Sequence, residues 1–180
     1  MLKILLHTCC APCGAYVIEQ LQKQGHAAVV FFTNDNIYPQ AEYERRQEEI
    51  KKYCQIQGVE FLTSDYHPEA WLAAVKGLEN EPEGGARCLV CFRYRLAKTA
   101  HQARAIGCDF FASTLSISPH KNSAVVNAVG QEVSEKIGVP FLAADWKENN
   151  GFQCSCELSH QHQFYRQNYC GCQFSLRKEE

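Results

Sequence analysis

Long apolar runs and an excess of positive charge are both missing from this sequence. No stretch of its 180 residues approaches the roughly 18 consecutive apolar residues of a membrane-spanning helix. The apolar start at residues 2–6 is too short for the hydrophobic part of a signal peptide, and no cleavage pattern follows it. A formal net charge of −2 provides no general attraction to nucleic acid, so such binding would need a local basic patch. We therefore expect a cytoplasmic protein with no membrane segment.

A glycine-rich phosphate loop is also absent. Phosphate-binding first turns are rich in glycine because glycine lets backbone amides approach the anion closely. Here residues 8–14 read TCCAPCG, and Pro12 has no amide hydrogen. The sequence therefore argues against an ATP site at this turn. Internal repeats, low-complexity tracts and linkers are missing too, which predicts a single domain over residues 1–180.

Short apolar segments alternate with segments of helical periodicity along most of the chain. The apolar segments are predicted as strands at residues 2–7, 27–33, 59–65, 108–114 and 139–145. Helices are predicted at residues 13–25, 41–58, 67–78, 88–107 and 121–138. This pattern favours an α/β fold, an open parallel sheet of about five strands with helices on both faces. Residues 147–180 show weaker periodicity, and we interpret them as an appendage of the same domain.

Cysteine is unusually frequent. The sequence contains 11 cysteines, at positions 9, 10, 13, 54, 88, 91, 108, 154, 156, 170 and 172. In a reducing cytoplasm a framework of structural disulfides is not expected, and an odd number does not pair off. The isolated Cys54 and Cys108 fit buried apolar positions. The clustered cysteines instead indicate metal binding or redox chemistry.

The topology predicts where these cysteines meet. In an open parallel sheet, ligands bind beyond the carboxyl ends of the strands. Cys88 and Cys91 begin a predicted helix, where the helix dipole favours thiolate. The strand ends and the loops after them bring the following candidates to the same edge: Cys9, Cys10, Cys13, Asn34, Asp35, Asn36, residues 113–121 and Asp145.

Two kinds of metal site fit the spacing. The C-x-x-C pairs Cys10/Cys13 and Cys88/Cys91 have the spacing of a structural zinc site. Cys9 is left over in that arrangement, and adjacent cysteines suit the separate irons of an iron–sulfur cluster better than one tetrahedral zinc. The spacing therefore favours iron–sulfur and leaves zinc open.

The tail carries a second redox signal. Cys170 and Cys172 are separated by one glycine, and a disulfide across such a small ring departs from relaxed geometry and is readily reduced. Labile pairs of this kind are typical of catalysis. The preceding residues 160–169, HQHQFYRQNY, suit base stacking and phosphate contacts, but they equally fit a helix that packs its aromatic residues on the core.

The motifs HTCCAPC, NDNIYP, EYERR, RCLVCFRYRL, STLSISPHKN, DWKENNGF and ELSHQHQFYRQNYCGC together resemble the QueH type of epoxyqueuosine reductase, over residues 2–175. The resemblance implies a Rossmann-like fold similar to adenine nucleotide hydrolases. It implies reduction of an epoxide to an alkene in the last step of queuosine synthesis, at the wobble position of GUN-anticodon tRNA, without cobalamin. It also implies a [4Fe-4S] cluster, whose ligand positions match Cys9, Cys10, Cys88 and Cys91, and a redox-active disulfide at positions that match Cys170 and Cys172.

Further roles follow from side-chain chemistry and the resemblance. Some family members hold an additional iron beside the cluster, for which Cys13 or Asp145 are the candidates here, and Cys13 is also a candidate proton donor. Asn34 and Asn36 offer amides for base or ribose contacts. The candidates for phosphate contacts are Arg45, Arg46, Lys121 and Arg166.

Besides the tRNA substrate, we expect a second partner, an external low-potential electron donor. Two other functions remain open, a zinc-stabilised tRNA-binding module and a general thiol–disulfide oxidoreductase built on the pair Cys170 and Cys172.

Overall fold

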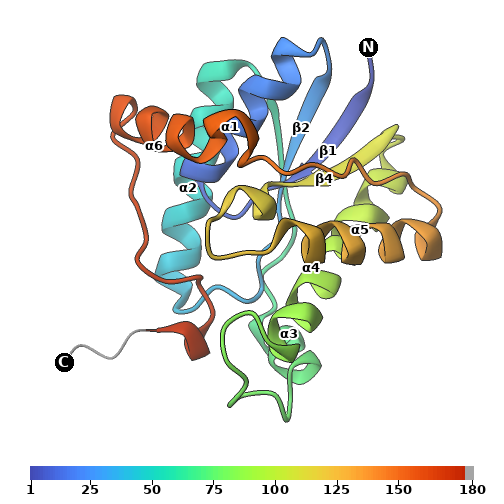
Figure 1. Ribbon diagram of the computed structural model, residues 1–180, viewed down its shortest axis with the longest axis vertical. Helices are drawn as coiled ribbons and strands as arrows, with labels where there is room; N and C mark the ends of the chain where they lie inside the picture. The colour runs from blue at the N-terminus through green and yellow to red at the C-terminus, as the bar shows by residue number, and fades with distance from the viewer. Residues whose placement is uncertain (177–180) are drawn as a thin grey trace.

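Four parallel strands form the centre of the fold (Figure 1). The computed structural model describes residues 1–176. Within this range the sheet order is β3-β2-β1-β4. The strands are β1 (Lys3–His7), β2 (Ala27–Phe32), β3 (Glu60–Thr63) and β4 (Phe110–Ser113). The predicted α/β fold with a parallel sheet is confirmed.

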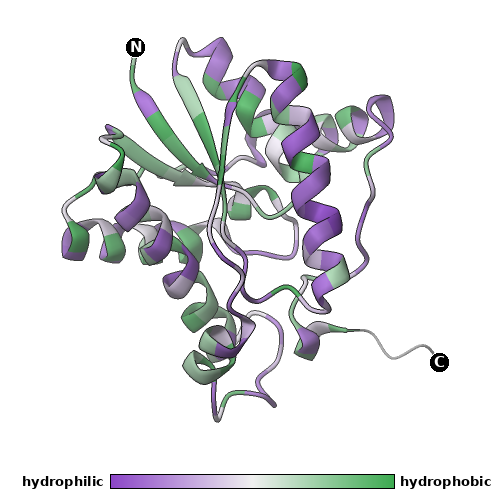
Figure 2. Cartoon of the chain, turned by 180° about the vertical axis from the view of Figure 1, so that it is seen from behind, coloured by the Kyte–Doolittle hydropathy of each residue, from purple (hydrophilic) through white to green (hydrophobic). Residues whose placement is uncertain are grey.

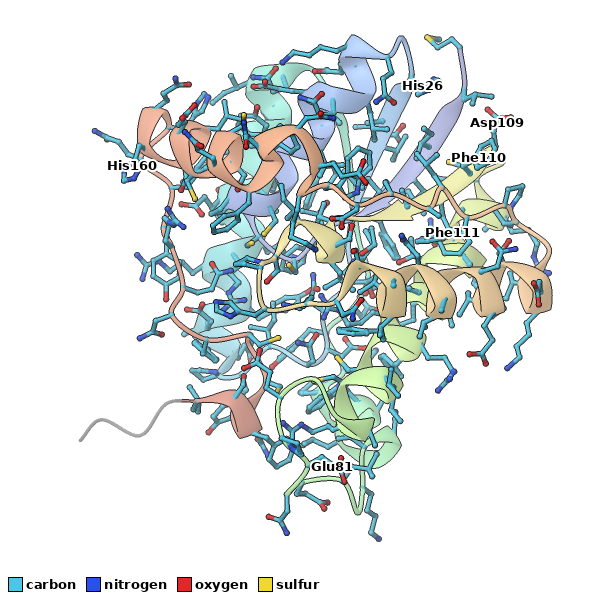
Figure 3. The ribbon with its side chains drawn as sticks, in the orientation of Figure 1. His26, Glu81, Asp109, Phe110, Phe111 and His160 are labelled. Atoms are coloured by element: carbon cyan, nitrogen blue, oxygen red, sulfur yellow. The ribbon has the colours of Figure 1, made fainter. Side chains whose placement is uncertain are left out.

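The predicted fifth strand at residues 139–145 is wrong. This segment pairs with β4 through a single bridge between Phe111 and Phe141. The Phe111 amide donates to Pro140 O at 3.0 Å, and the Leu142 amide donates to Phe111 O at 2.9 Å. Pro140 has no amide hydrogen to extend the ladder. The apolar character of the segment instead reflects packing, because the rings of Phe111 and Phe141 lie 5.0 Å apart. Phe111 belongs to β4, the edge strand of the sheet (Figure 3).

Helices cover both faces of the sheet. The first layer contains α1 (Ala11–Lys23), α2 (Gln40–Gln57) and α6 (Gly151–Gln161), and the second contains α4 (Ala86–Ala105) and α5 (Ser123–Ile137). Alternate residues of β1 serve the two layers: Ile4 and Leu6 pack with α1 and α2, whereas Leu5 packs with α4 and α5. Figure 2 shows the apolar strands between helices whose outer faces are polar. Burial on both faces explains why the strands are almost continuously apolar.

Shorter elements complete the chain. The short helix α3 (Pro68–Ala74) packs near the start of α4 (Figure 1). The 3-10 turns are η1 (Thr114–Ile117), η2 (Glu148–Asn150) and η3 (Gln173–Ser175). After α6, residues 162–172, which we call the strap, run without helical structure along α2. Among residues 1–176, no helix has both the length and the apolar character needed to cross a bilayer.

Candidate functional site

Three cysteine thiols meet where β1 passes into α1. Cys10 is the N-cap of α1, Cys9 precedes it, and Cys13 lies in the first helical turn. Their sulfur atoms all lie within 4.8 Å of one another. Gly14 keeps this turn close to its neighbours, because a Cβ there would lie 2.7 Å from Thr8 Cγ2. The tight packing of the turn therefore sets the positions of the three thiols, which we call the thiol triad.

The triad favours a negative charge. Hydrogen bonds with Cys10 and Cys13 hold the pKa of Cys9 well below its usual value, and Arg95 and Lys121 add to this effect. Hydrogen bonding with Cys10 and Cys9 raises the pKa of Cys13. Of the three thiols, Cys9 therefore loses its proton most readily, and a cation that binds to the triad displaces the other protons as well.

A buried polar network supports the triad from behind. Arg95 Nη2 donates to Asn34 Oδ1 at 3.0 Å, and Arg95 Nε donates to His7 Nε2 at 3.3 Å. The Asn34 amide nitrogen donates to Thr8 O at 2.9 Å, and His7 Nδ1 lies 3.0 Å from Ser113 Oγ. Burial, together with the charge of Arg95, lowers the pKa of His7 to about 3. His7 is therefore neutral at pH 7 and acts as an acceptor for Arg95.

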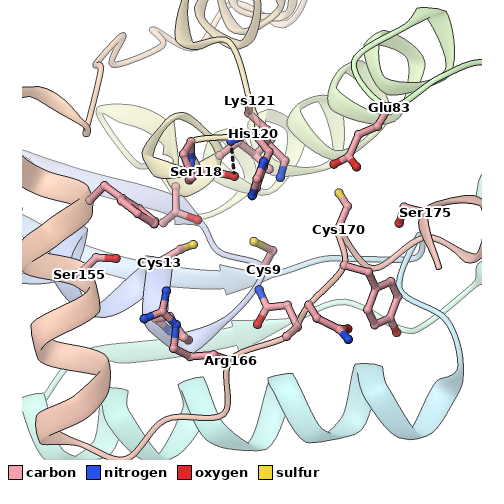
Figure 4. Close-up of a pocket in the computed structure, with 18 residues that line it drawn as sticks. Cys9, Cys13, Glu83, Ser118, His120, Lys121, Ser155, Arg166, Cys170 and Ser175 are labelled. Carbon is pink, nitrogen blue, oxygen red and sulfur yellow. Dashed lines mark hydrogen bonds between the residues drawn. The ribbon is translucent and has the colours of Figure 1, made fainter. Parts of the chain in front are cut away.

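The triad opens into a cavity of about 280 Å³ (Figure 4). Its lining includes three distant parts of the chain: the turn with Cys9 and Cys13, the loop with Lys121, and the strap with Cys170. Burial alone lowers the pKa of Lys121, but the neighbouring thiols of Cys170, Cys9 and Cys13 raise it to about 12. The cavity thus combines sulfur groups with a permanent positive charge.

Cys88, in the first turn of α4, lines an adjoining space. A smaller cavity of about 50 Å³ is bounded by Cys88, and it shares Glu83, His120, Lys121 and Cys170 with the larger one. Cys88 Sγ accepts a hydrogen bond from the Gly84 amide at 3.2 Å.

Cys91 is more deeply placed. Arg95 Nη1 donates to Cys91 Sγ at 3.8 Å, and Cys91 packs with Cys172 and Trp71. The structure therefore brings Cys9, Cys10 and Cys13 together, while Cys88 and Cys91 approach from the side of Cys170.

The predicted binding residues occupy three kinds of position. Lys121 and Arg166 line the large cavity. Asn34 and Asn36 are buried at the end of β2, and both ends of the Asn34 amide bond within the protein. Arg45 is exposed on α2, where its guanidinium lies 3.4 Å from the centre of the Tyr165 ring.

Asp145 lies outside the set of cavity-lining residues and helps to anchor a loop. Its carboxylate accepts a hydrogen bond from Ser123 Oγ at 2.6 Å and pairs with Lys147 Nζ at 3.2 Å. Lys147 also donates to Ser116 O at 2.7 Å and to Lys121 O at 3.3 Å. Asp145 thereby acts on the loop that carries Lys121.

Several lining residues were missed in the sequence. Gln167 Nε2 donates to Cys10 Sγ at 3.2 Å, a contact between the strap and the triad that no local spacing predicts. Phe152 lies in the first turn of α6 and lines the cavity. His120 was not missed, because it belongs to residues 113–121, which the topology predicts at this edge. Glu83 comes from a polar loop, and no feature of the sequence around it indicated a place in the site.

The comparison of sequences identifies one family. A family model described as epoxyqueuosine reductase QueH matches residues 4–178. An epoxyqueuosine reductase QueH of Streptococcus pyogenes is 46% identical over 182 residues, covering 98% of this chain and 71% of that protein. The protein of the same name from Thermotoga maritima is 36% identical and covers 96% of this chain and 90% of that protein.

Solved structures resemble this chain in fold. The U34-tRNA thiolase NcsA from Methanococcus maripaludis, solved with its [4Fe-4S] cluster, has a TM-score of 0.60 at 15% identity and covers 98% of this chain and 62% of that one. A predicted tRNA methyltransferase subunit from Methanocaldococcus jannaschii has a TM-score of 0.61 at 11% identity, covering 89% of this chain and 75% of that one. At these identities the similarity concerns the fold alone.

Proposed function

Since the chain belongs to the epoxyqueuosine reductase QueH family, we propose that it reduces the epoxide of epoxyqueuosine in tRNA to the alkene of queuosine. The observation that carries this proposal is the cavity in which Cys9, Cys13, Cys170 and Lys121 meet from three distant segments (Figure 4). Reduction needs two electrons and two protons, and the epoxide oxygen leaves as water. Thiols can supply the electrons and protons, and the cation of Lys121 can stabilise the negative charge on the leaving oxygen.

The donor set fits an iron–sulfur cluster. Three thiols within 4.8 Å, one of them with a lowered pKa, are the soft ligands that such clusters take. We propose that Cys9 and Cys10 hold the cluster together with Cys88 and Cys91. When bound, the cluster supplies electron transfer and a Lewis acid. An additional iron, with Cys13 as its candidate ligand, remains part of the proposal.

The chain's own residues would handle the protons and the charge. A dithiol at Cys170 and Cys172 that closes to a disulfide releases two electrons and two protons, which balances the loss of the epoxide oxygen as water. An external low-potential donor then restores the dithiol. Lys121 Nζ supplies positive charge beside the leaving oxygen, and Cys13 is a second proton source within the cavity.

The tail belongs to the proposed active site. Phe152, Ser155, Arg166 and Cys170 all line the cavity, which supports a single domain over residues 1–180 with 147–180 as the appendage that completes the site. Residues 177–180 of this range lie outside the described part. Arg45, Lys121 and Arg166 are proposed to contact tRNA phosphates. Asn34 and Asn36 are buried, so their proposed effect on the substrate acts through the residues that they hold, such as Arg95. A tRNA substrate is consistent with the expected cytoplasmic location.

The deciding experiment follows the nucleoside. Protein loaded anaerobically with iron and sulfide is incubated with epoxyqueuosine-containing tRNA and a low-potential reductant, and the digested nucleosides are analysed by mass. We expect epoxyqueuosine to lose one oxygen atom. Colourless zinc protein that binds tRNA unchanged would favour the binding module. Turnover of simple disulfides with an unchanged nucleoside would favour the general oxidoreductase.

Phe152 offers a test of substrate binding. Its side chain is 37% exposed and lines the cavity, so a base can stack on it. We expect Phe152→Ala to raise KM by about tenfold, since stacking on an aromatic ring contributes about 1–3 kcal/mol per base. Phe152→Tyr is expected to keep the native KM. Leu72→Ala is the matched control, because Leu72 is also 37% exposed but lies on α3, outside the cavity-lining set. Steady-state kinetics with substrate tRNA measures the effect, and an unchanged KM in Phe152→Ala would contradict it.

A further inference from the structure

The buried guanidinium of Arg46 joins α2 to the turn that carries Cys170 and Cys172. Its side chain is 1% exposed. Arg46 Nε donates to Glu42 Oε1 at 2.6 Å, and Nη1 donates to Cys170 O at 3.3 Å. The guanidinium also lies 5.3 Å from the centre of the Tyr169 ring. One buried side chain therefore contacts its own helix and two residues of the strap.

We propose that Arg46 is a positioning residue that holds the Cys170–Gly171–Cys172 turn against the cavity. A buried arginine is costly unless it is paired, so its contacts are strongly favoured over a loosened turn. Glu42 supplies the opposite charge on α2. The Cys170 carbonyl supplies the second acceptor, which ties the turn to the helix. The importance of this turn for turnover rests on the proposed function, whereas the contacts themselves do not.

Gly171 allows the close approach of the turn to Arg46. Its φ of +126° is a conformation that residues with a side chain rarely adopt. A Cβ at this position would lie 3.2 Å from Arg46 Nη1 and 3.1 Å from Ile37 Cγ1. The turn thus rests directly on the guanidinium, with no side chain between them.

A second set of contacts fixes the other side of the turn. The Tyr38 amide donates to Gly171 O at 2.8 Å, and the Tyr169 hydroxyl donates to Tyr38 O. These bonds hold the turn against the loop after β2. Tyr38 precedes Pro39, the N-cap of α2, so these bonds hold the turn near the start of the helix, whereas Arg46 ties it to the body of the helix.

The neighbouring Arg45 provides a matched comparison. It lies on the same helix and also contacts the strap, but it is exposed and stacks on Tyr165, upstream of the turn. Tyr165 makes two further hydrogen bonds: its amide donates to Glu49 Oε1 at 2.7 Å, and its hydroxyl donates to Glu42 Oε2 at 3.2 Å. Loss of Arg45 therefore leaves this part of the strap attached.

The test measures thiol accessibility in the full chain, purified and reduced anaerobically. Brief alkylation with N-ethylmaleimide, followed by peptide mass analysis, gives a rate for each cysteine. Cys172 is 7% exposed and is expected to react slowly in the native protein. In Arg46→Met we expect Cys172 to react about tenfold faster. The variant loses one charge-assisted hydrogen bond to the turn, so the open turn that exposes Cys172 becomes about tenfold more populated. Cys54 in the core should keep its native rate.

The variants separate positioning from general stability. Arg45→Met should leave all rates native, and an equal effect of both substitutions would overturn the proposal. Arg46→Lys should give an intermediate rate, because one ammonium cannot reproduce the fork of contacts. A native rate in the lysine variant would overturn the two-contact arrangement.

A second variant covers the case in which Arg46→Met does not fold. Glu42→Gln with Arg46→Met removes the unpaired carboxylate, and the same selective labelling of Cys172 is expected. Native labelling of Cys172 in either folded variant would contradict the proposal. Labelling of Cys54 along with the turn in the double variant would also overturn it, because Arg46 would then support the whole fold rather than the turn.

Discussion

Replacing Cys10 by alanine is expected to leave the protein colourless after anaerobic loading with iron and sulfide. Cys10 lies in the thiol triad, and its replacement removes one of the four thiolate bonds that hold a cluster of this kind. Cys9→Ala, Cys88→Ala and Cys91→Ala should have the same effect. Iron and sulfide content, with the broad absorbance near ~400 nm of thiolate-bound clusters, measures the outcome.

Two further variants make this prediction selective. Cys54→Ala should keep full iron content, because Cys54 is buried alone in α2, where burial raises its pKa to about 12. Cys13→Ala should keep the cluster if the ligands are those that the family resemblance implies. Loss of iron in Cys13→Ala with full retention in the double variant Cys88→Ala and Cys91→Ala would assign the cluster to the thiol triad instead.

Replacing both Cys170 and Cys172 by serine is expected to abolish most turnover and leave the cluster intact. Cys170 faces the cavity, whereas neither residue belongs to the triad. Without the pair, electrons and protons no longer reach the epoxide together, and we expect multiple turnover to fall by about 100-fold or more, in the range that positioned proton transfer contributes. Cluster absorbance and affinity for tRNA should stay native.

The redox state of the pair can be followed directly. Alkylation before and after reduction, read by mass analysis, counts the free thiols at Cys170 and Cys172. We expect two thiols in reduced protein and none after one turnover without an electron donor. Two free thiols under every redox condition, with normal turnover of the double serine variant, would reject the assignment.

Local patterns were sufficient for the layers of the fold. The alternation of apolar strands and amphipathic helices predicted a parallel sheet covered on both faces, because both features depend on neighbouring residues. The segment at residues 139–145 has the same apolar character as a strand. It differs because Pro140 cannot donate to a ladder and Phe141 is held by ring packing, and whether such a segment pairs depends on its distant neighbour Phe111.

The site was predicted less completely than the fold. The sequence placed Cys9, Cys10 and Cys13 at one strand end, since all three lie within one turn. Charge alone could not distinguish Arg45 from Arg46, although the first is exposed and the second buried. Their difference comes from the strap, whose path along α2 is set by tertiary contacts more than 100 positions away in the sequence, such as Cys170 O with Arg46.

The two edges of the sheet bear on how the protein behaves at high concentration. An unpaired edge strand invites a second chain to add its own strand, which leads to aggregation. At one edge, β3 has only 4 residues and begins with the exposed Glu60. At the other edge, the segment around Pro140 covers β4. Pro140 has no backbone N–H that could donate to an added strand. Both edges therefore disfavour strand addition, a useful property in a protein that must be concentrated with its thiols reduced.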